Sequence, residues 1–109
     1  MKKKIPLTFQ GTIRIIYQIK KALNSSRITG WEMSFLDNIH KRILKYSNRV
    51  LLSEKEWNRL IIIFENTNTP SLELTDKQIL QKFHKLFLKF EKGNIIVQPN
   101  KKNLTFFNL

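Results

Sequence analysis

Apolar residues recur at helical spacing in three parts of the chain, and the same local signal stands before each of them. Thr29, Ser53 and Thr75 are each followed three residues later by a Glu or a Gln. In such a capping box the hydroxyl accepts a hydrogen bond from a free amide of the first helical turn, and the Glu or Gln side chain accepts one from the amide of the capping residue. The three helices predicted in this way cover residues 30–47, 54–66 and 76–92.

The first two predicted helices each have a broad apolar face. In residues 30–47 the inward positions are expected to be Trp31, Phe35, Leu36, Ile39, Ile43 and Tyr46. In residues 54–66 they are expected to be Trp57, Leu60, Ile61 and Phe64. Because Ile62 and Ile63 extend the apolar surface around this second segment, a buried strand is the alternative there, and the capping box favours a helix.

The third predicted helix, residues 76–92, carries a basic stripe. Its apolar face holds Ile79, Leu80, Phe83, Leu86, Phe87 and Phe90, and Gly93 fits the position just after a helix end. On another face four lysines follow one another at spacings of three, four and three, namely Lys82, Lys85, Lys89 and Lys92. Such a stripe is either a binding surface for an anionic partner or a solvated helix face.

Residues 7–23 fit two patterns. As a helix over residues 9–23, the segment has an apolar face made of Phe9, Ile13, Ile16, Ile19 and Leu23, and another face with Arg14, Tyr17, Gln18 and Lys21. As a strand over residues 7–19, its apolar residues alternate with polar ones, with Gly11 as a bulge and Ile16 as the only exception. Because a strand of this length would exceed the usual five or six residues, the helix is favoured.

The two ends of the chain complete a single domain. Residues 1–8 are expected to form a basic N-terminal arm, and residues 9–93 the helical domain. Residues 94–109 fit a hairpin whose tip carries Lys101 and Lys102, and equally a tail that docks through Phe106 and Phe107. The expected fold is mainly α, a small single-domain bundle of about four helices, which a C-terminal hairpin would make winged-helix-like.

The composition excludes several classes of protein. With 109 residues, 41% of them hydrophobic, the chain has the size of one domain. The absence of cysteine excludes a disulfide framework, a zinc ribbon and thiolate catalysis. The longest apolar run, residues 60–64, is far shorter than the roughly 20 residues needed to cross a bilayer, and no apolar signal core follows the N-terminal lysines. We therefore expect an intracellular, cytoplasmic protein without membrane insertion.

Charge is the strongest functional signal in the sequence. The chain has 20 Lys and Arg against 8 Asp and Glu, a net charge of +12, and residues 1–30 contain no acidic residue. This balance favours a polyanionic partner, nucleic acid first, whose phosphates the basic side chains would neutralise. Lysines that only keep a small protein in solution are the alternative. The candidate nucleic-acid-binding residues are Lys2, Lys3, Lys4, Arg14, Lys20, Lys21, Arg27, Lys82, Lys85, Lys89, Lys92, Lys101 and Lys102.

No arrangement of residues points to catalysis, to a cofactor or to a metal. Glu32, Glu56 and Asp76 stand in predicted first turns, where the helix dipole favours negative charge. His40 and His84 stand alone on lysine-rich helix flanks, which suits exposure or phosphate contact better than metal binding. We therefore expect a protein that is not an enzyme and uses no cofactor.

The middle of the chain carries a recognisable pattern. It consists of Gly30-Trp31-Glu32, Phe35-Leu36-Asp37-Asn38-Ile39, Leu51-Leu52-Ser53-Glu54-Lys55 and Leu60. This pattern resembles a short helix-pair module (W-E-x-x-F-L-x-x-I … L-S-x-K-Q-x-x-x-L) of uncharacterised phage, plasmid and bacterial proteins, some associated with DNA replication or transfer. Glu56 stands where the module usually has Gln. The resemblance implies a DNA-associated or mobile-element context, with no catalytic residues to carry over.

These patterns together predict a small, basic, non-enzymatic protein that binds the phosphate backbone of DNA or RNA electrostatically. The alternative is a protein-interaction module, either a subunit of a larger ribonucleoprotein or an inhibitor that docks on an acidic protein surface. A role at a membrane surface ranks third, because the basic helix faces lack exposed Trp or Phe to insert.

Overall fold

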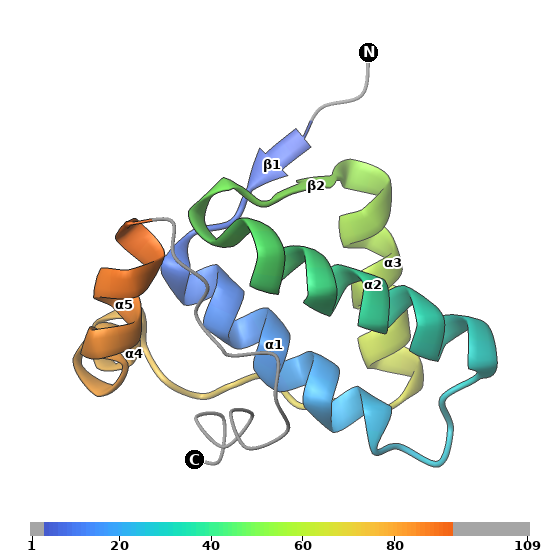
Figure 1. The fold of residues 1–109 in the computed structure, drawn as a ribbon. Helices are drawn as coiled ribbons and strands as arrows, with labels where there is room; N and C mark the ends of the chain where they lie inside the picture. Colours follow the sequence, from blue (N-terminus) through green and yellow to red (C-terminus); the bar gives the residue numbers. More distant parts are fainter. Residues whose placement is uncertain (1–3, 93–109) are drawn as a thin grey trace.

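The computed structural model describes residues 4–92 and shows a mainly helical protein with one small antiparallel sheet (Figure 1). Five α-helices and a short 3-10 helix, η1, lie within these residues. In chain order the elements are β1 (Lys4–Pro6), α1 (Phe9–Leu23), α2 (Gly30–Tyr46), η1 (Ser47–Arg49), β2 (Leu51–Ser53), α3 (Glu54–Asn66), α4 (Asp76–Lys82) and α5 (His84–Glu91).

All three predicted capping boxes are present, at the starts of α2, α3 and α4. In α3, for example, Ser53 Oγ accepts from the Glu56 amide at 3.1 Å, and Glu56 Oε1 accepts from the Ser53 amide at 2.9 Å. These bonds satisfy amides that have no partner within the helix. The predicted start positions of the three helices are therefore confirmed.

Residues 9–23 form a helix, and its first turn shows why. Thr8 caps α1, since its Oγ1 accepts from the Gly11 amide at 3.0 Å. A Cβ atom added to Gly11 would lie 3.1 Å from that same oxygen, so the glycine leaves room for the cap. The strand alternative for this segment is wrong.

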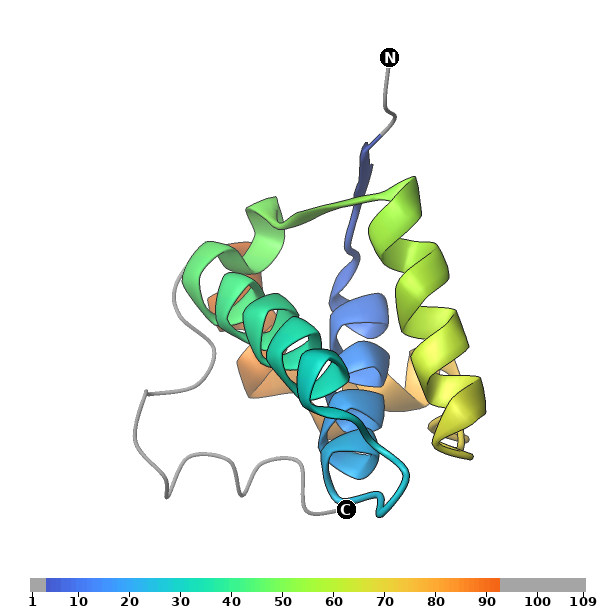
Figure 2. The same ribbon diagram turned by 90° about the vertical axis from the view of Figure 1, so that its right-hand side faces the viewer.

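Helix α1 is the centre of the fold. Figure 2 shows it between α2 and α3, and α4 also packs against it. Its buried residues cover about half of its circumference and include Ile13, Ile15, Ile16 and Ile19. Each fully buried side chain of this size contributes roughly 1.5–3 kcal/mol to the stability of the fold through the hydrophobic effect. The packing of α1 is therefore a large contribution to the core.

The buried faces of α2 and α3 are narrower than the sequence predicts. Leu36, Ile39 and Ile43 of α2 are fully buried, whereas Trp31 and Tyr46, at its two ends, are exposed. In α3 the buried residues are Leu60, Ile63 and Phe64, and Ile61 is 52% exposed. Residues three and four positions apart share a helix face, so Ile63 and Phe64 follow Leu60 into the core while Ile61 turns away.

The expected long helix over residues 76–92 is divided into two at Phe83, which corrects that prediction. Phe83 has φ −113° and ψ 32°, outside regular helix geometry, and separates α4 from α5. Phe83 and Phe90 are both buried. The Phe87 and Phe90 rings pack edge-on to Phe9, at centroid distances of 5.3 and 5.6 Å.

The small sheet was not predicted. Strands β1 and β2 pair antiparallel at one end of the helices, with Ile5 opposite Leu52 (Figure 2). Lys4, expected in a basic arm, is therefore part of a strand. Residues 1–3 and 93–109 lie outside the described residues, and with them the expected C-terminal hairpin or tail on which a winged arrangement depends.

Candidate nucleic-acid interface

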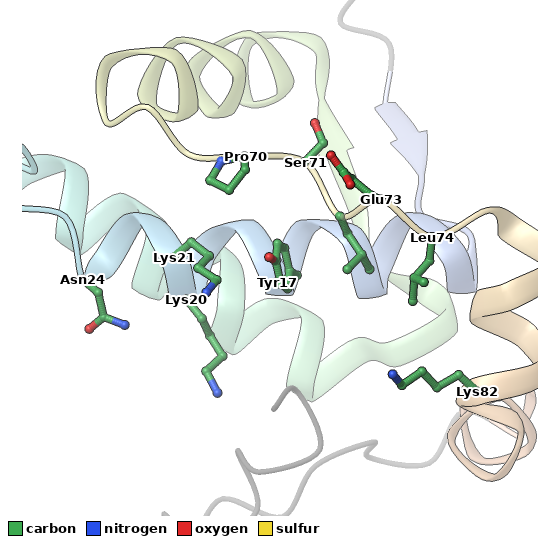
Figure 3. A pocket seen from close by; sticks show the side chains of 10 residues that line it. Tyr17, Lys20, Lys21, Asn24, Pro70, Ser71, Glu73, Leu74 and Lys82 are labelled. Atoms are coloured by element: carbon green, nitrogen blue, oxygen red, sulfur yellow. The ribbon is translucent and has the colours of Figure 1, made fainter. Parts of the chain in front are cut away.

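A groove with a volume of about 750 Å³ lies between the C-terminal half of α1 and the segment that joins α3 to α4 (Figure 3). Helix α1 contributes Tyr17, Lys20, Lys21 and Asn24, the joining segment contributes residues 70–74, and the end of α4 contributes Lys82. We call this the basic groove. Three of the predicted nucleic-acid-binding lysines therefore meet on one concave surface.

Arg14 holds the wall of the basic groove in place. Its guanidinium donates to the carbonyl oxygens of Leu72 and Leu74 at 2.9 and 2.5 Å, and to Asp76 Oδ1 at 2.9 Å. The planar guanidinium can reach all three oxygens at once because its five donors are fixed in a fork. Arg14, which the sequence suggested as a phosphate contact, is thus engaged in positioning residues 72–76 against α1.

Lys20 is the lysine of the basic groove whose surroundings disfavour its charged form. Partial burial lowers the pKa of Lys20 below its usual value of 10.5, and the neighbouring charge of Lys21 lowers it further. The ammonium of Lys21 lies 5.5 Å from the centre of the Tyr17 ring, within the range of a cation–π contact. An anion bound here would offset both effects on Lys20, because it would favour the charged form.

The other predicted basic residues do not join this groove. Lys85, Lys89 and Lys92 are exposed on α5 and at its C-terminal end, and the break at Phe83 separates them from Lys82. Arg27 is exposed in the turn between α1 and α2, and Lys4 is exposed in β1. Lys2, Lys3, Lys101 and Lys102 lie outside the described residues. The predicted stripe is therefore divided between two surfaces.

Tyr17, Asn24 and residues 70–74 are lining residues that the sequence analysis did not single out. The predicted helix places Tyr17 on its polar face with Lys21, so the sequence contains a signal that Tyr17 lies at a basic surface. The proximity of residues 70–74 had no local signal, because the bonds that hold them join residues about 60 positions apart.

Several acidic side chains form ion pairs and do not line the basic groove. Glu56 forms an ion pair with Arg42, with Oε2 and Nη1 2.5 Å apart, and Arg42 also donates to the Leu51 carbonyl at 2.7 Å. The hydrogen bond from Arg42 is the main reason that the pKa of Glu56 lies below its usual value of 4.5. The predicted pair of Asp37 and Lys41 is present at 3.0 Å. Among the residues that line the basic groove, only Glu73 is acidic.

Within residues 4–92 no three His, Cys, Asp or Glu side chains are grouped in a way that could hold a metal ion. None of the helices in this range is both long enough and apolar enough to cross a membrane.

His40 is a partly buried histidine of α2 on the side that faces Lys20. Its Nε2 is buried and has no hydrogen-bond partner within residues 4–92. Burial lowers the pKa of His40 below its usual value of 6.5; Asp37 opposes this shift, and the charge of Lys20 adds to it. The folded state therefore favours neutral His40.

This lowered pKa predicts a pH effect on stability. Below pH 6.5 the unfolded chain binds more protons at this position than the folded chain, so the free energy of unfolding decreases as the pH falls. We expect the free energy of unfolding of His40→Gln, measured with urea, to decrease less between pH 7 and 5, a range that spans the usual histidine pKa of 6.5. His84→Gln, at an exposed position of α5, is the control and should keep the pH dependence of the natural chain. An unchanged pH dependence in His40→Gln would contradict the assignment.

Comparisons with protein-family models, with curated proteins and with solved structures find no match to this chain. The resemblance of residues 30–65 to a helix-pair module stays a prediction. The function is therefore inferred from the geometry of the basic groove.

Proposed function

We propose that this protein is a non-enzymatic nucleic-acid-binding protein that contacts the phosphate backbone through the basic groove. The proposal rests on one observation: Lys20 and Lys21 of α1 and Lys82 of α4 line the same concave surface. Lysines in such an arrangement neutralise neighbouring phosphates and release condensed counterions. Lysines that only keep a protein in solution would not need to lie together in a groove.

The position of the acidic residues supports the same function. Glu73 is the one acidic side chain among the residues that line the groove, whereas Glu32, Glu56 and Asp76 are engaged in helix caps or ion pairs and do not line it. Their charges therefore do little to neutralise the three groove lysines. The net charge of +12 adds a long-range attraction that steers a polyanion toward the protein.

The experiment compares variants of the full chain in binding to a fluorescently labelled oligonucleotide over a range of salt concentrations. Replacing Lys20, Lys21 and Lys82 together with Gln is expected to weaken binding by about tenfold at moderate salt. The slope of log K against log salt should fall by about 2 to 3, which corresponds to the loss of three phosphate contacts.

A matched control removes the same charge from another part of the surface. Lys45, Lys55 and Lys77 are exposed and do not line the groove. Their replacement with Gln should leave most of the affinity in place, because only the long-range attraction is reduced. Equal losses in the two triple variants would contradict a specific role for the groove, and salt-independent or absent binding would contradict the proposed function.

A second candidate function is protein interaction, and exposed apolar residues favour it. Ile61 and Ile62 are 52% and 53% exposed side by side on α3, and Trp31 is 58% exposed. Large apolar side chains gathered at a surface are common where proteins meet. An interaction module would bind oligonucleotides poorly and would retain a protein partner after nuclease treatment at moderate salt.

A further inference from the structure

The shape of the basic groove bears on which form of nucleic acid it accepts. Proteins commonly read duplex DNA by inserting a protruding helix or ribbon into the major groove. Here the three lysines line an open concavity of about 750 Å³. A concavity of this size can take in part of a flexible strand, such as a nucleotide unit, whereas a duplex keeps its bases stacked inside and offers the groove only its backbone.

The lining of the groove is suited to more than phosphate. Pro70, Leu72 and Leu74 add apolar surface, and the Tyr17 ring lies among them (Figure 3). A ligand made only of phosphate and sugar would leave this apolar surface unused. A single strand offers both parts, because its bases can leave the stack and lie on an aromatic ring while its phosphates bind cations.

The ring of Tyr17 is reachable from the groove. The Lys21 ammonium lies 5.5 Å from the ring centre, so one face of the ring is open to a side chain from the same surface. When Lys21 turns to bind a phosphate, that face becomes available for a base. Glu73 lines the same groove, and in the view of Figure 3 its carboxylate lies above α1, near Ser71, whereas the Lys20 and Lys82 ammonium groups lie below α1.

We propose that the basic groove binds single-stranded nucleic acid, with one base stacked on Tyr17 and the neighbouring phosphates on Lys20, Lys21 and Lys82. This inference rests on the proposed function and adds the form of the nucleic acid and the aromatic contact. Stacking of a base on an aromatic side chain is sequence-tolerant, because every base has a flat face. The groove therefore distinguishes a single strand from a duplex without reading sequence.

The first test uses the natural full chain and needs no variant. Its probes are a single-stranded oligodeoxynucleotide, a strand of the same length with abasic sites throughout, and a duplex of the same length. The abasic strand keeps the phosphates and removes the bases, so we expect it to bind about tenfold more weakly than the intact strand, the loss of a stacked base. Equal binding of the intact and abasic strands would overturn the inference.

The second test assigns the effect to Tyr17. Tyr17→Leu removes the ring and keeps an apolar side chain, and it should reduce binding of the intact strand by about tenfold while leaving binding of the abasic strand unchanged. Tyr17→Phe keeps the ring and should bind both strands as the natural chain does. Circular dichroism of each variant checks that the helices are intact. A Tyr17→Leu variant that is folded and still prefers the intact strand would overturn the role of the ring.

The results separate the two proposals. If the intact strand, the abasic strand and the duplex all bind equally well, in a salt-dependent manner that the three lysines control, the stacking inference fails and the proposed function stands. If none of the three probes binds, the proposed function fails as well.

Discussion

Replacing Glu56 with Ala is expected to lower the free energy of unfolding by about 3 kcal/mol. Glu56 accepts from the Ser53 amide at the start of α3 and from the guanidinium of Arg42 on α2. Alanine removes the bond to the Ser53 amide, which is one of the two bonds of the capping box, and leaves Arg42, whose side chain is only 28% exposed, without its carboxylate. Loss of that hydrogen bond costs about 1 kcal/mol, and loss of the largely buried ion pair adds about 2 kcal/mol, between the values for surface and buried pairs. Urea unfolding followed by circular dichroism measures the difference.

Glu56→Gln separates the two contributions. The amide oxygen of Gln can still accept from the Ser53 amide, so the capping box is kept while the charge is lost. We expect a cost of about 1–2 kcal/mol at neutral pH. Because the pKa of Glu56 is lowered in the folded state, the advantage of the natural chain is present above pH 4.5 and is lost as the pH falls through the folded-state pKa. A difference between Glu and Gln that persists unchanged in strong acid would contradict this origin.

Replacing Arg14 with Ala is expected to cost about 2 kcal/mol and to weaken nucleic-acid binding as well. The variant loses the hydrogen bonds to the Leu72 and Leu74 carbonyls and the ion pair with Asp76. Each such bond from a charged donor contributes about 1 kcal/mol when partly exposed. Without them the segment that forms one wall of the basic groove is no longer fixed to α1. Thermal unfolding and oligonucleotide binding measure the two effects.

Arg14→Lys distinguishes a positioning role from a direct phosphate contact. Lysine keeps the charge, but its single ammonium cannot reproduce the fork that reaches three oxygens. If Arg14 positions the groove wall, most of the lost stability and affinity stays lost in Arg14→Lys. Arg59→Ala, at an exposed position of α3, is the control and should change stability by less than about 0.5 kcal/mol. A lysine variant as stable and as tightly binding as the natural chain would contradict the positioning role.

Prediction from the sequence succeeded where structure depends on neighbours within one helical turn. The Ser53 hydroxyl accepts from the Glu56 amide and the Glu56 carboxylate accepts from the Ser53 amide, so both bonds join residues only three positions apart. The same holds for Asp37 and Lys41, four residues apart. These local bonds explain why the starts of α2, α3 and α4 and the helical class of the fold were predictable.

The sequence predictions were wrong where contacts between residues distant in the sequence accompany a structure that the local pattern does not show. The periodicity of residues 76–92 fits one continuous helix, but the helix breaks at Phe83, and Phe87 and Phe90 of α5 pack against Phe9, which is distant in the sequence. Strands β1 and β2, three residues each, are too short to give a periodic signal, and their pairing joins Lys4 to Ser53. Packing of distant residues therefore decided both features.

The sequence by itself determined that this chain is basic, mainly helical and capped at Thr29, Ser53 and Thr75, because these properties depend on composition and on contacts within a turn. Only the tertiary structure decided which cations act together. It places Lys82 on the same groove as Lys20 and Lys21, and it turns Arg14 toward the chain segment 58 to 62 residues further on. Such groupings depend on how the helices pack around α1, and charge patterns along the chain contain no information about that packing.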